Sequence, residues 1–264
     1  MPLDIICHTL SGVAIGTVAA NFSKQSWKTK FWSVFLGGLG AALPDFDAIS
    51  LWSKFDGTIG KLLGLQHTGS QIYFGKFWYS HHAAFHSLFA AIGLAVLATL
   101  VIWMIKRQNV LRFIHQNGLL YGSFILGFVV HLLEDMPTPA AVWGGVNFFF
   151  PSDAYIGGFG KIWWWNNYDI FLIILGVITL NLIVLGLPKK WYSVRSGISF
   201  SALVLGAGFS CYQMFTRPID FSYSGHTEKY DYYEKQSKEI QRQILGGQVF
   251  NMMESLDNKI PLYF

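Results

Sequence analysis

The sequence predicts an all-α fold: a polytopic membrane helical bundle of about six transmembrane helices with a polar C-terminal tail. Of the 264 residues, 52% are hydrophobic and only 13% are charged, an apolar content beyond what a soluble core of this size needs. Several apolar windows are nearly free of charge and are long enough to cross roughly 30 Å of hydrocarbon at about 1.5 Å per residue. We therefore expect an integral membrane protein.

The first two apolar segments are predicted at residues 3–20 and 31–43. The first contains Gly12 and Gly16, at the spacing that lets two membrane helices approach closely. The second is short because Pro44 follows it, and the residue before a proline is pushed out of the helical region.

Two carboxylates follow that proline directly. Asp45 and Asp47 are expected at or below the membrane surface, in an extended segment where residues two apart point to the same side. Residues 50–78 then form a long mixed loop, with a short interfacial helix predicted near residues 59–65.

The third and fourth apolar segments, residues 82–105 and 118–135, are joined by a basic connection. Three of the eight histidines lie at the start of the third segment. With Ser80 as the predicted N-cap, His82 and His86 are four apart and share a helix face. A solvated helix start, in which the histidines only cap or hydrogen-bond, is the alternative.

The fifth and sixth segments are predicted at residues 168–187 and 197–215, after a run of three tryptophans typical of the lipid headgroup level. The tail, residues 216–264, is polar. It predicts either a solvated tail or an amphipathic helix that lies on the membrane or over a site. The apolar side of that helix contains Tyr230, Tyr233, Ile240 and Ile244.

The distribution of basic residues predicts the topology. Loops after the first, third and fifth segments hold nine cations and the other two loops hold four, so the positive-inside rule places the nine in the cytoplasm. Both termini then face outward. The nine are Lys24, Lys28, Lys30, Lys106, Arg107, Arg112, Lys189, Lys190 and Arg195; the four are Lys54, Lys61, Lys76 and Lys161.

With this topology, four polar clusters lie at the same, outer end of their own helices. Ionisable groups at membrane depth are costly and usually mark a functional site, although a lone membrane histidine is more often a hydrogen-bonded packing residue. The clusters are His8; Asp45 with Asp47; His81, His82 and His86; and His131 with Asp135.

These side chains predict a metal site. His131 and Asp135 are four apart on one helix, a common spacing for two ligands of one metal, and Glu134 is either a partner of a ligand or a general base. Imidazole with carboxylate suits a divalent metal, zinc first and manganese or iron next. More than four candidate ligands suit two or more ions.

The motifs resemble a known family, the YdjM-like, LexA-regulated, membrane-bound metal-dependent hydrolases. The likeness covers roughly residues 5–155 and implies a hydrolase whose His/Asp pattern is similar to that of zinc-dependent phospholipase C. His81 and His86 match the family's ligands, whereas His82 replaces the arginine of its His-Arg-Gly-x-Thr-His-Ser stretch. The motifs are His8 with Gly12, Leu-Pro-Asp-Phe-Asp at 43–47, and residues 81–87, 127–135 and 145–151.

The sequence thus predicts a transmembrane metal-hydrolase domain, residues 1–215, and an extracytoplasmic polar or amphipathic tail. We expect cleavage of a phosphate ester, in a phospholipid or lipid-linked substrate, by metal-activated water near the outer face of a bacterial inner membrane. A metal-ion or proton transporter and a non-catalytic scaffold are the alternatives. No nucleic-acid partner is expected, and the oligomeric state is left open. Expected ligands are His8, Asp45, Asp47, His81, His86, His131 and Asp135; expected catalytic residues are Asp47, Glu134 and His82.

Overall fold

The computed structural model describes residues 2–107, 109–218, 220–221 and 230–259, and every regular element in these ranges is helical. The long helices are α1 (Pro2–Phe22), α2 (Trp27–Ala42), α4 (Leu88–Lys106), α5 (Val110–Asp135), α6 (Tyr168–Leu185), α7 (Tyr192–Phe215) and α8 (Tyr230–Asp257). Short elements are η1 (Pro44–Leu51), η2 (Asp56–Gly60), α3 (Gly69–Tyr73) and η3 (Lys189–Trp191).

The predicted membrane bundle is confirmed. Five helical stretches are long and apolar enough to cross a membrane: most of α1, then α4, α5, α6, and η3 together with α7. Helix α2 and η1, which are bent by 46° at their junction, form a sixth span if the pair is taken as one. The chain is therefore a multi-pass integral membrane protein.

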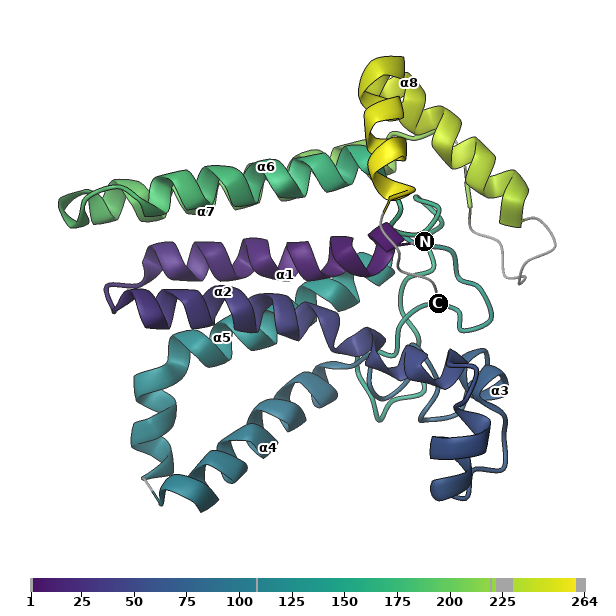
Figure 1. Ribbon diagram of the computed structural model, residues 1–264, viewed down its shortest axis with the longest axis horizontal. Coiled ribbons are helices and arrows are strands. Elements are labelled where there is room, and N and C mark those ends of the chain that lie inside the picture. Colours follow the sequence, from purple (N-terminus) through teal and green to yellow (C-terminus); the bar gives the residue numbers. More distant parts are fainter. Residues whose placement is uncertain (1, 108, 219, 222–229, 260–264) are drawn as a thin grey trace.

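Helix α1 lies at the centre of the bundle and packs against α2 and α5 on one side and α6 and α7 on the other (Figure 1). Glycines allow the closest of these contacts. A Cβ atom at Gly12 of α1 or at Gly127 of α5 would collide with the backbone carbonyl of Gly37 in α2. The close approach predicted from Gly12 and Gly16 is confirmed, and it brings three helices together rather than two.

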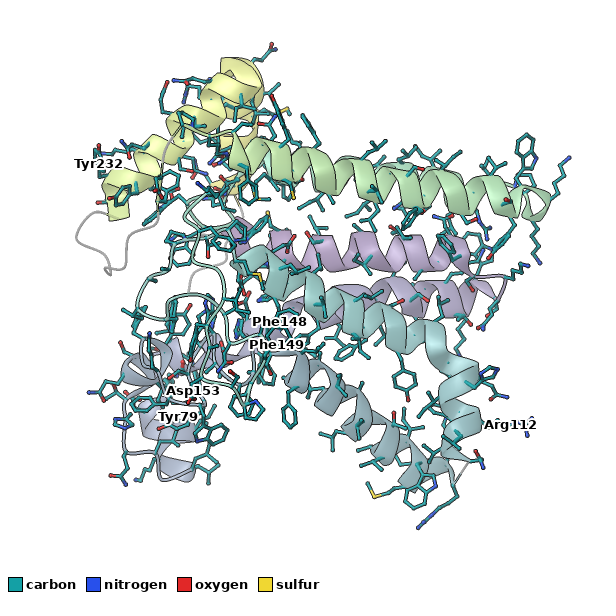
Figure 2. All side chains as sticks on the ribbon, turned by 180° about the vertical axis from the view of Figure 1, so that it is seen from behind. Tyr79, Arg112, Phe148, Phe149, Asp153 and Tyr232 are labelled. Carbon is teal, nitrogen blue, oxygen red and sulfur yellow. The ribbon has the colours of Figure 1, made fainter. Side chains whose placement is uncertain are left out.

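The connections separate to opposite ends of the bundle. The α1–α2, α4–α5 and α6–α7 turns lie at one end, whereas the first residues of α1, α3, α8 and the loop between α5 and α6 lie at the other (Figure 1). Figure 2 shows the same separation, with Arg112 far from Tyr79 and Asp153. The two sets of loops that were compared for the topology prediction therefore lie on different sides.

Two predicted element boundaries are wrong. Helix α4 begins at Leu88 instead of residue 82, and Ser87 caps it by accepting a hydrogen bond from the Ala90 amide. His82 and His86 consequently lie in a loop and share no helix face. Helix α5 begins at Val110 and is kinked at Asn117, so most of the expected basic connection is helical.

The segment after Pro44 also differs from the prediction. Proline ends α2 as expected, but Asp45 and Asp47 lie in the 3₁₀ helix η1 rather than in an extended segment. Proline is well tolerated at the first position of a helix, because its missing N–H has no helical partner there. The chain therefore turns into a new short helix in place of a strand-like segment. The interfacial helix expected near 59–65 is present as the helical turn that begins with η2.

The tail contains the predicted amphipathic helix, α8, with a break at Gly246. Ile240 is buried, and with Tyr233 it packs around Trp163 and Phe221. Ile244 is exposed, and the side chain of Tyr230 lies outside the described residues. The apolar side of α8 thus covers the loop before α6.

Candidate metal centre

Side chains from four parts of the chain converge at the loop-rich end of the bundle. Helix α1 contributes one, η1 two, the loop before α4 three, and the C-terminal end of α5 three. All the residues that the sequence analysis assigned to metal binding or catalysis lie in this one cluster. They are His8, Asp45, Asp47, His81, His82, His86, His131, Glu134 and Asp135.

The most deeply buried group consists of His86, His131 and Asp135. The Oδ2 atom of Asp135 lies 3.2 Å from Nε2 of His131 and 3.8 Å from Nε2 of His86. None of these three atoms has a hydrogen-bond partner, although all are inaccessible to solvent. Buried polar atoms in folded proteins are nearly always paired. A cation among these atoms would satisfy all three at once.

Hydrogen bonds on the far side of the rings orient three of the histidines. His131 donates from Nδ1 to the Ala41 carbonyl at 2.7 Å, and His82 donates from Nδ1 to the Gly145 carbonyl at 3.0 Å. Nδ1 of His8 is hydrogen-bonded to Glu134 at 2.9 Å. In His131 and His82 the proton is thereby fixed on Nδ1, which leaves the lone pair on Nε2. A second partner of this kind is typical of metal-binding histidines.

The Asp47 carboxylate lies beside two of the histidine rings. Its Oδ1 atom lies 2.7 Å from Nδ1 of His81 and its Oδ2 atom lies 3.2 Å from Nδ1 of His86. Asp47 belongs to none of the groups of potential ligand atoms found among the described residues. Asp47 thus contacts two of the histidine rings, and its expected role as a metal ligand stays a prediction.

The potential ligands form three overlapping groups. In each group the ligand atoms lie within 4.8 Å of one another. His131 and His86 each belong to two groups, but a neutral imidazole has one free lone pair, so each ring can bind an ion in only one of its groups at a time. The groups are His86, His131 and Asp135; His8, Asp45 and His131; and His81, His82 and His86.

The centre is accessible from its carboxylate side. The side chains of Asp45 and Asp47 are 18% and 14% exposed, whereas those of His86 and His131 are 0% exposed. The imidazoles therefore form the inner wall and η1 forms the outer edge, from which water can approach.

Two histidines in the loop have opposite electrostatic surroundings. Burial lowers the pKa of His86, but Asp47 and Asp45 outweigh this effect and raise the pKa to about 10. Burial, followed by the neighbouring His81, holds the pKa of His82 well below its ordinary value. The same loop therefore holds one histidine whose surroundings favour the charged form and one whose surroundings favour the neutral form.

His82 also has an unusual backbone conformation. Its φ angle of 61° lies in the left-handed region, which is uncommon for residues other than glycine. The loop after α5 holds it in place, because the Asn147 amide donates to the His82 carbonyl at 2.8 Å while the His82 ring donates to Gly145. Strained residues of this kind cluster at functional sites.

Sequence reasoning missed several neighbours of the histidines. The Tyr73 ring stacks on His81 with ring centres 4.3 Å apart, and the Trp143 ring lies 4.6 Å from that of His82. The carbonyl groups of Ala41 and Gly145 are backbone partners that leave no signal in side-chain identity. Aromatic residues are too frequent in this chain for Tyr73 or Trp143 to stand out.

The helices and the centre together define a multi-pass membrane protein with a buried histidine–carboxylate cluster at one end of its bundle. Within that class, the chain belongs to the YdjM inner membrane protein family, whose model matches residues 3–217. The match includes α1 to α7 and stops before α8. Comparisons with curated proteins and with solved structures find no match.

Proposed function

We propose that this protein is a metal-dependent hydrolase that cleaves a phosphate ester, in a phospholipid or lipid-linked substrate. The observation that carries the proposal is the convergence of unpaired, buried donor atoms from His86, His131 and Asp135. Histidine with carboxylate is the donor set expected for zinc, with manganese or iron as alternatives. Such ions supply Lewis acidity, which activates water and neutralises charge on phosphate oxygens.

The residues divide into ligands and orienting groups. His8, Asp45, His86, His131 and Asp135 are positioned to hold ions, and the third group of potential ligand atoms adds His81 and His82. Asp47 orients His81 and His86.

The Glu134 carboxylate lies at the edge of the centre, where it is hydrogen-bonded to His8. Its carboxylate is 11% exposed and lies against Nδ1 of His8, while its backbone carbonyl accepts a hydrogen bond from Trp165. These contacts support a role in fixing the His8 ring, and the carboxylate is close enough to the centre to take up a proton from water during hydrolysis.

A transporter would need titratable groups that continue toward the opposite end of the bundle. The buried polar residues there include Thr17, Asn21, Asn181 and Ser199, which hydrogen-bond one another, Arg195, which donates to the Asn21 carbonyl, and Lys30. This set contains neither histidine nor carboxylate, and such contacts join membrane helices in general. It supports hydrolysis over transport.

We place the metal centre near the extracytoplasmic face, with both termini outside. The support is that the centre lies at the end of the bundle opposite the more basic loops (Figure 1). Reporter fusions to the C-terminus test the orientation, because an alkaline phosphatase fusion is active outside the cytoplasm and inactive within it. An inactive fusion would reverse the assignment.

Metal content tests the proposed function. The detergent-purified protein should contain stoichiometric transition metal, and His131→Ala and Asp135→Ala should lose it. His115→Ala is the control, since this histidine lies on the same helix but is exposed. Phosphate or headgroup release from a mixed lipid extract should require the metal. Metal-free wild-type protein, or release that chelators do not inhibit, would contradict the proposal.

A further inference from the structure

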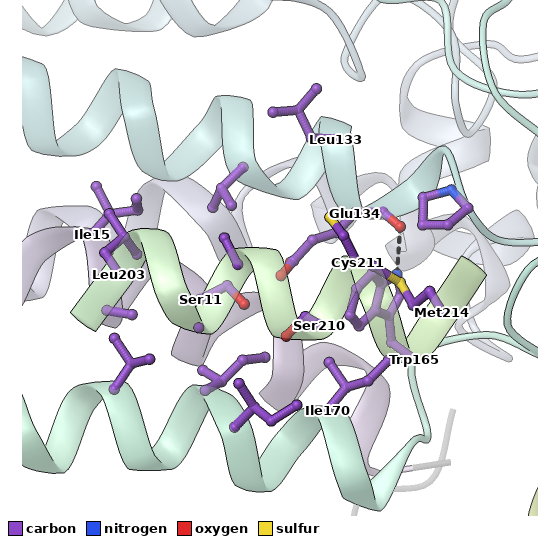
Figure 3. Close-up of a pocket in the computed structure, with 18 residues that line it drawn as sticks. Ser11, Ile15, Leu133, Glu134, Trp165, Ile170, Leu203, Ser210, Cys211 and Met214 are labelled. Atoms are coloured by element: carbon purple, nitrogen blue, oxygen red, sulfur yellow. Dashed lines mark hydrogen bonds between the residues drawn. The ribbon is translucent and has the colours of Figure 1, made fainter. Parts of the chain in front are cut away.

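An apolar cavity of about 240 Å³ lies beside the metal centre, between helices α1, α5, α6 and α7 (Figure 3). These helices are all among the candidate membrane spans, so the cavity lies within the spanning part of the bundle. An apolar cavity of roughly 150 Å³ already takes up benzene, so this space is large enough for part of a hydrocarbon chain.

The lining follows helical periodicity on two facing helices. Helix α6 contributes Ile170, Ile173, Ile174 and Val177, three or four residues apart. Helix α7 contributes a matching row of lining residues, and the side chains at the middle of this row, Gly206 and Ala207, are the smallest. Gly206 lets α7 approach α6 closely, because a Cβ atom there would lie 2.4 Å from the Val177 side chain, whereas a larger side chain at Ala207 would extend into the cavity.

One end of the cavity is polar and leads to the metal centre. Glu134 lines the cavity, as do Ser11 and Trp165 (Figure 3). The Glu134 carboxylate lies 2.9 Å from Nδ1 of His8, and Nε2 of His8 lies 3.5 Å from Asp135. A chain bound in the cavity would therefore have its polar end within one side chain of the potential ligands.

We propose that this cavity holds an acyl chain of the lipid whose phosphate ester is cleaved at the metal centre; this inference rests on the proposed function. A hydrocarbon chain matches the apolar lining of a cavity that lies between candidate membrane-spanning helices, and its polar head would lie where Glu134 and His8 are. The substrate class is then a lipid with at least one long acyl chain rather than a soluble ester.

Filling the cavity tests the inference. Ala207→Phe places an aromatic ring on the lining, whereas Val204→Phe, on the same helix, places one on an exposed surface outside it. We expect Ala207→Phe to lower hydrolysis of a long-chain phospholipid at least tenfold. Hydrolysis of a short-chain phosphate ester, measured below its critical micelle concentration, should stay at the wild-type rate. The metal content should also stay at the wild-type value. Val204→Phe should leave all three unchanged.

A binding assay separates this inference from the proposed function. Photo-crosslinking with a phospholipid that carries a diazirine in its acyl chain should label cavity residues of wild type and Val204→Phe, but not of Ala207→Phe. Equal loss of long-chain and short-chain hydrolysis, no loss of either, or undiminished labelling of Ala207→Phe would overturn the inference. If cross-linking is lost in Ala207→Phe but wild type shows no metal-dependent hydrolysis, the proposed hydrolase function is rejected and the lipid-binding cavity is retained. If Ala207→Phe does not fold, Ser210→Leu gives the same comparison with a smaller change on the same lining.

Discussion

Replacement of Asp47 by asparagine tests whether this residue orients ligands or binds metal itself. Asp47 contacts Nδ1 of His81 at 2.7 Å and Nδ1 of His86 at 3.2 Å, so Asp47→Asn removes the charge that polarises two rings while it preserves their packing. Loss of an outer partner of a metal-binding histidine typically weakens metal affinity by about 10–100-fold. At about 1.4 kcal/mol per factor of ten, the expected cost is about 1.4–2.8 kcal/mol of binding free energy.

Competition with a chromophoric chelator measures this affinity directly. Asp47→Asn should bind the same number of ions as wild type, each at lower affinity. Asp153→Asn is the matched control, because this carboxylate is exposed and lies in a loop at the same end of the bundle (Figure 2). Loss of a whole equivalent of metal would show that Asp47 is a direct ligand, and unchanged affinity would show that its contacts with the rings have no energetic role.

Three further predictions concern stability. Gly127→Ala should lower the thermal midpoint of the detergent-purified protein because its Cβ collides with the Gly37 carbonyl, whereas Gly122→Ala, which meets no atom within 4 Å, should not lower it. Removal of bound metal by a chelator should cost about 2.7 kcal/mol of unfolding free energy at a free metal concentration about 100 times the dissociation constant, and the thermal midpoint should recover when metal is restored. Arg217→Met should cost about 3–5 kcal/mol in chemical unfolding, because it leaves Asp169, now bound at 2.7 Å, as an unpaired buried charge. An unfolding free energy equal to that of wild type would contradict the role of the ion pair.

The apolar segments were predictable because composition alone determines which stretches can exist in hydrocarbon. Segments 3–20, 168–187 and 197–215 each correspond to a helix with ends displaced by a few residues. The convergence of the polar clusters was predictable for a related reason. Each cluster lies at one end of its own apolar segment, and alternating crossings bring these ends to the same side.

Local patterns failed where tertiary contacts determine the backbone. The spacing of His82 and His86 fits a helix, yet the loop after α5 holds His82 at a positive φ angle through two hydrogen bonds. Asp45 and Asp47 were expected in an extended segment, but the chain turns into η1, and both still reach the histidines. The conformation of His82 depends on residues distant in sequence, whereas Pro44 at the first position of η1 is a local signal for a helix that the extended-segment prediction did not weigh.

The sequence by itself therefore determined the class of protein, the membrane segments and the residue types that gather at one end. Only the tertiary structure decided which ring nitrogens face inward, that Asp47 lies beside two histidine rings, and that a cavity lies between Glu134 and helices α6 and α7. The physical reason is the distance along the sequence over which each property is determined. Transfer into hydrocarbon depends on each segment's own composition, whereas the hydrogen bonds to the Ala41 and Gly145 carbonyls and the cavity beside Ala207 depend on how distant helices pack.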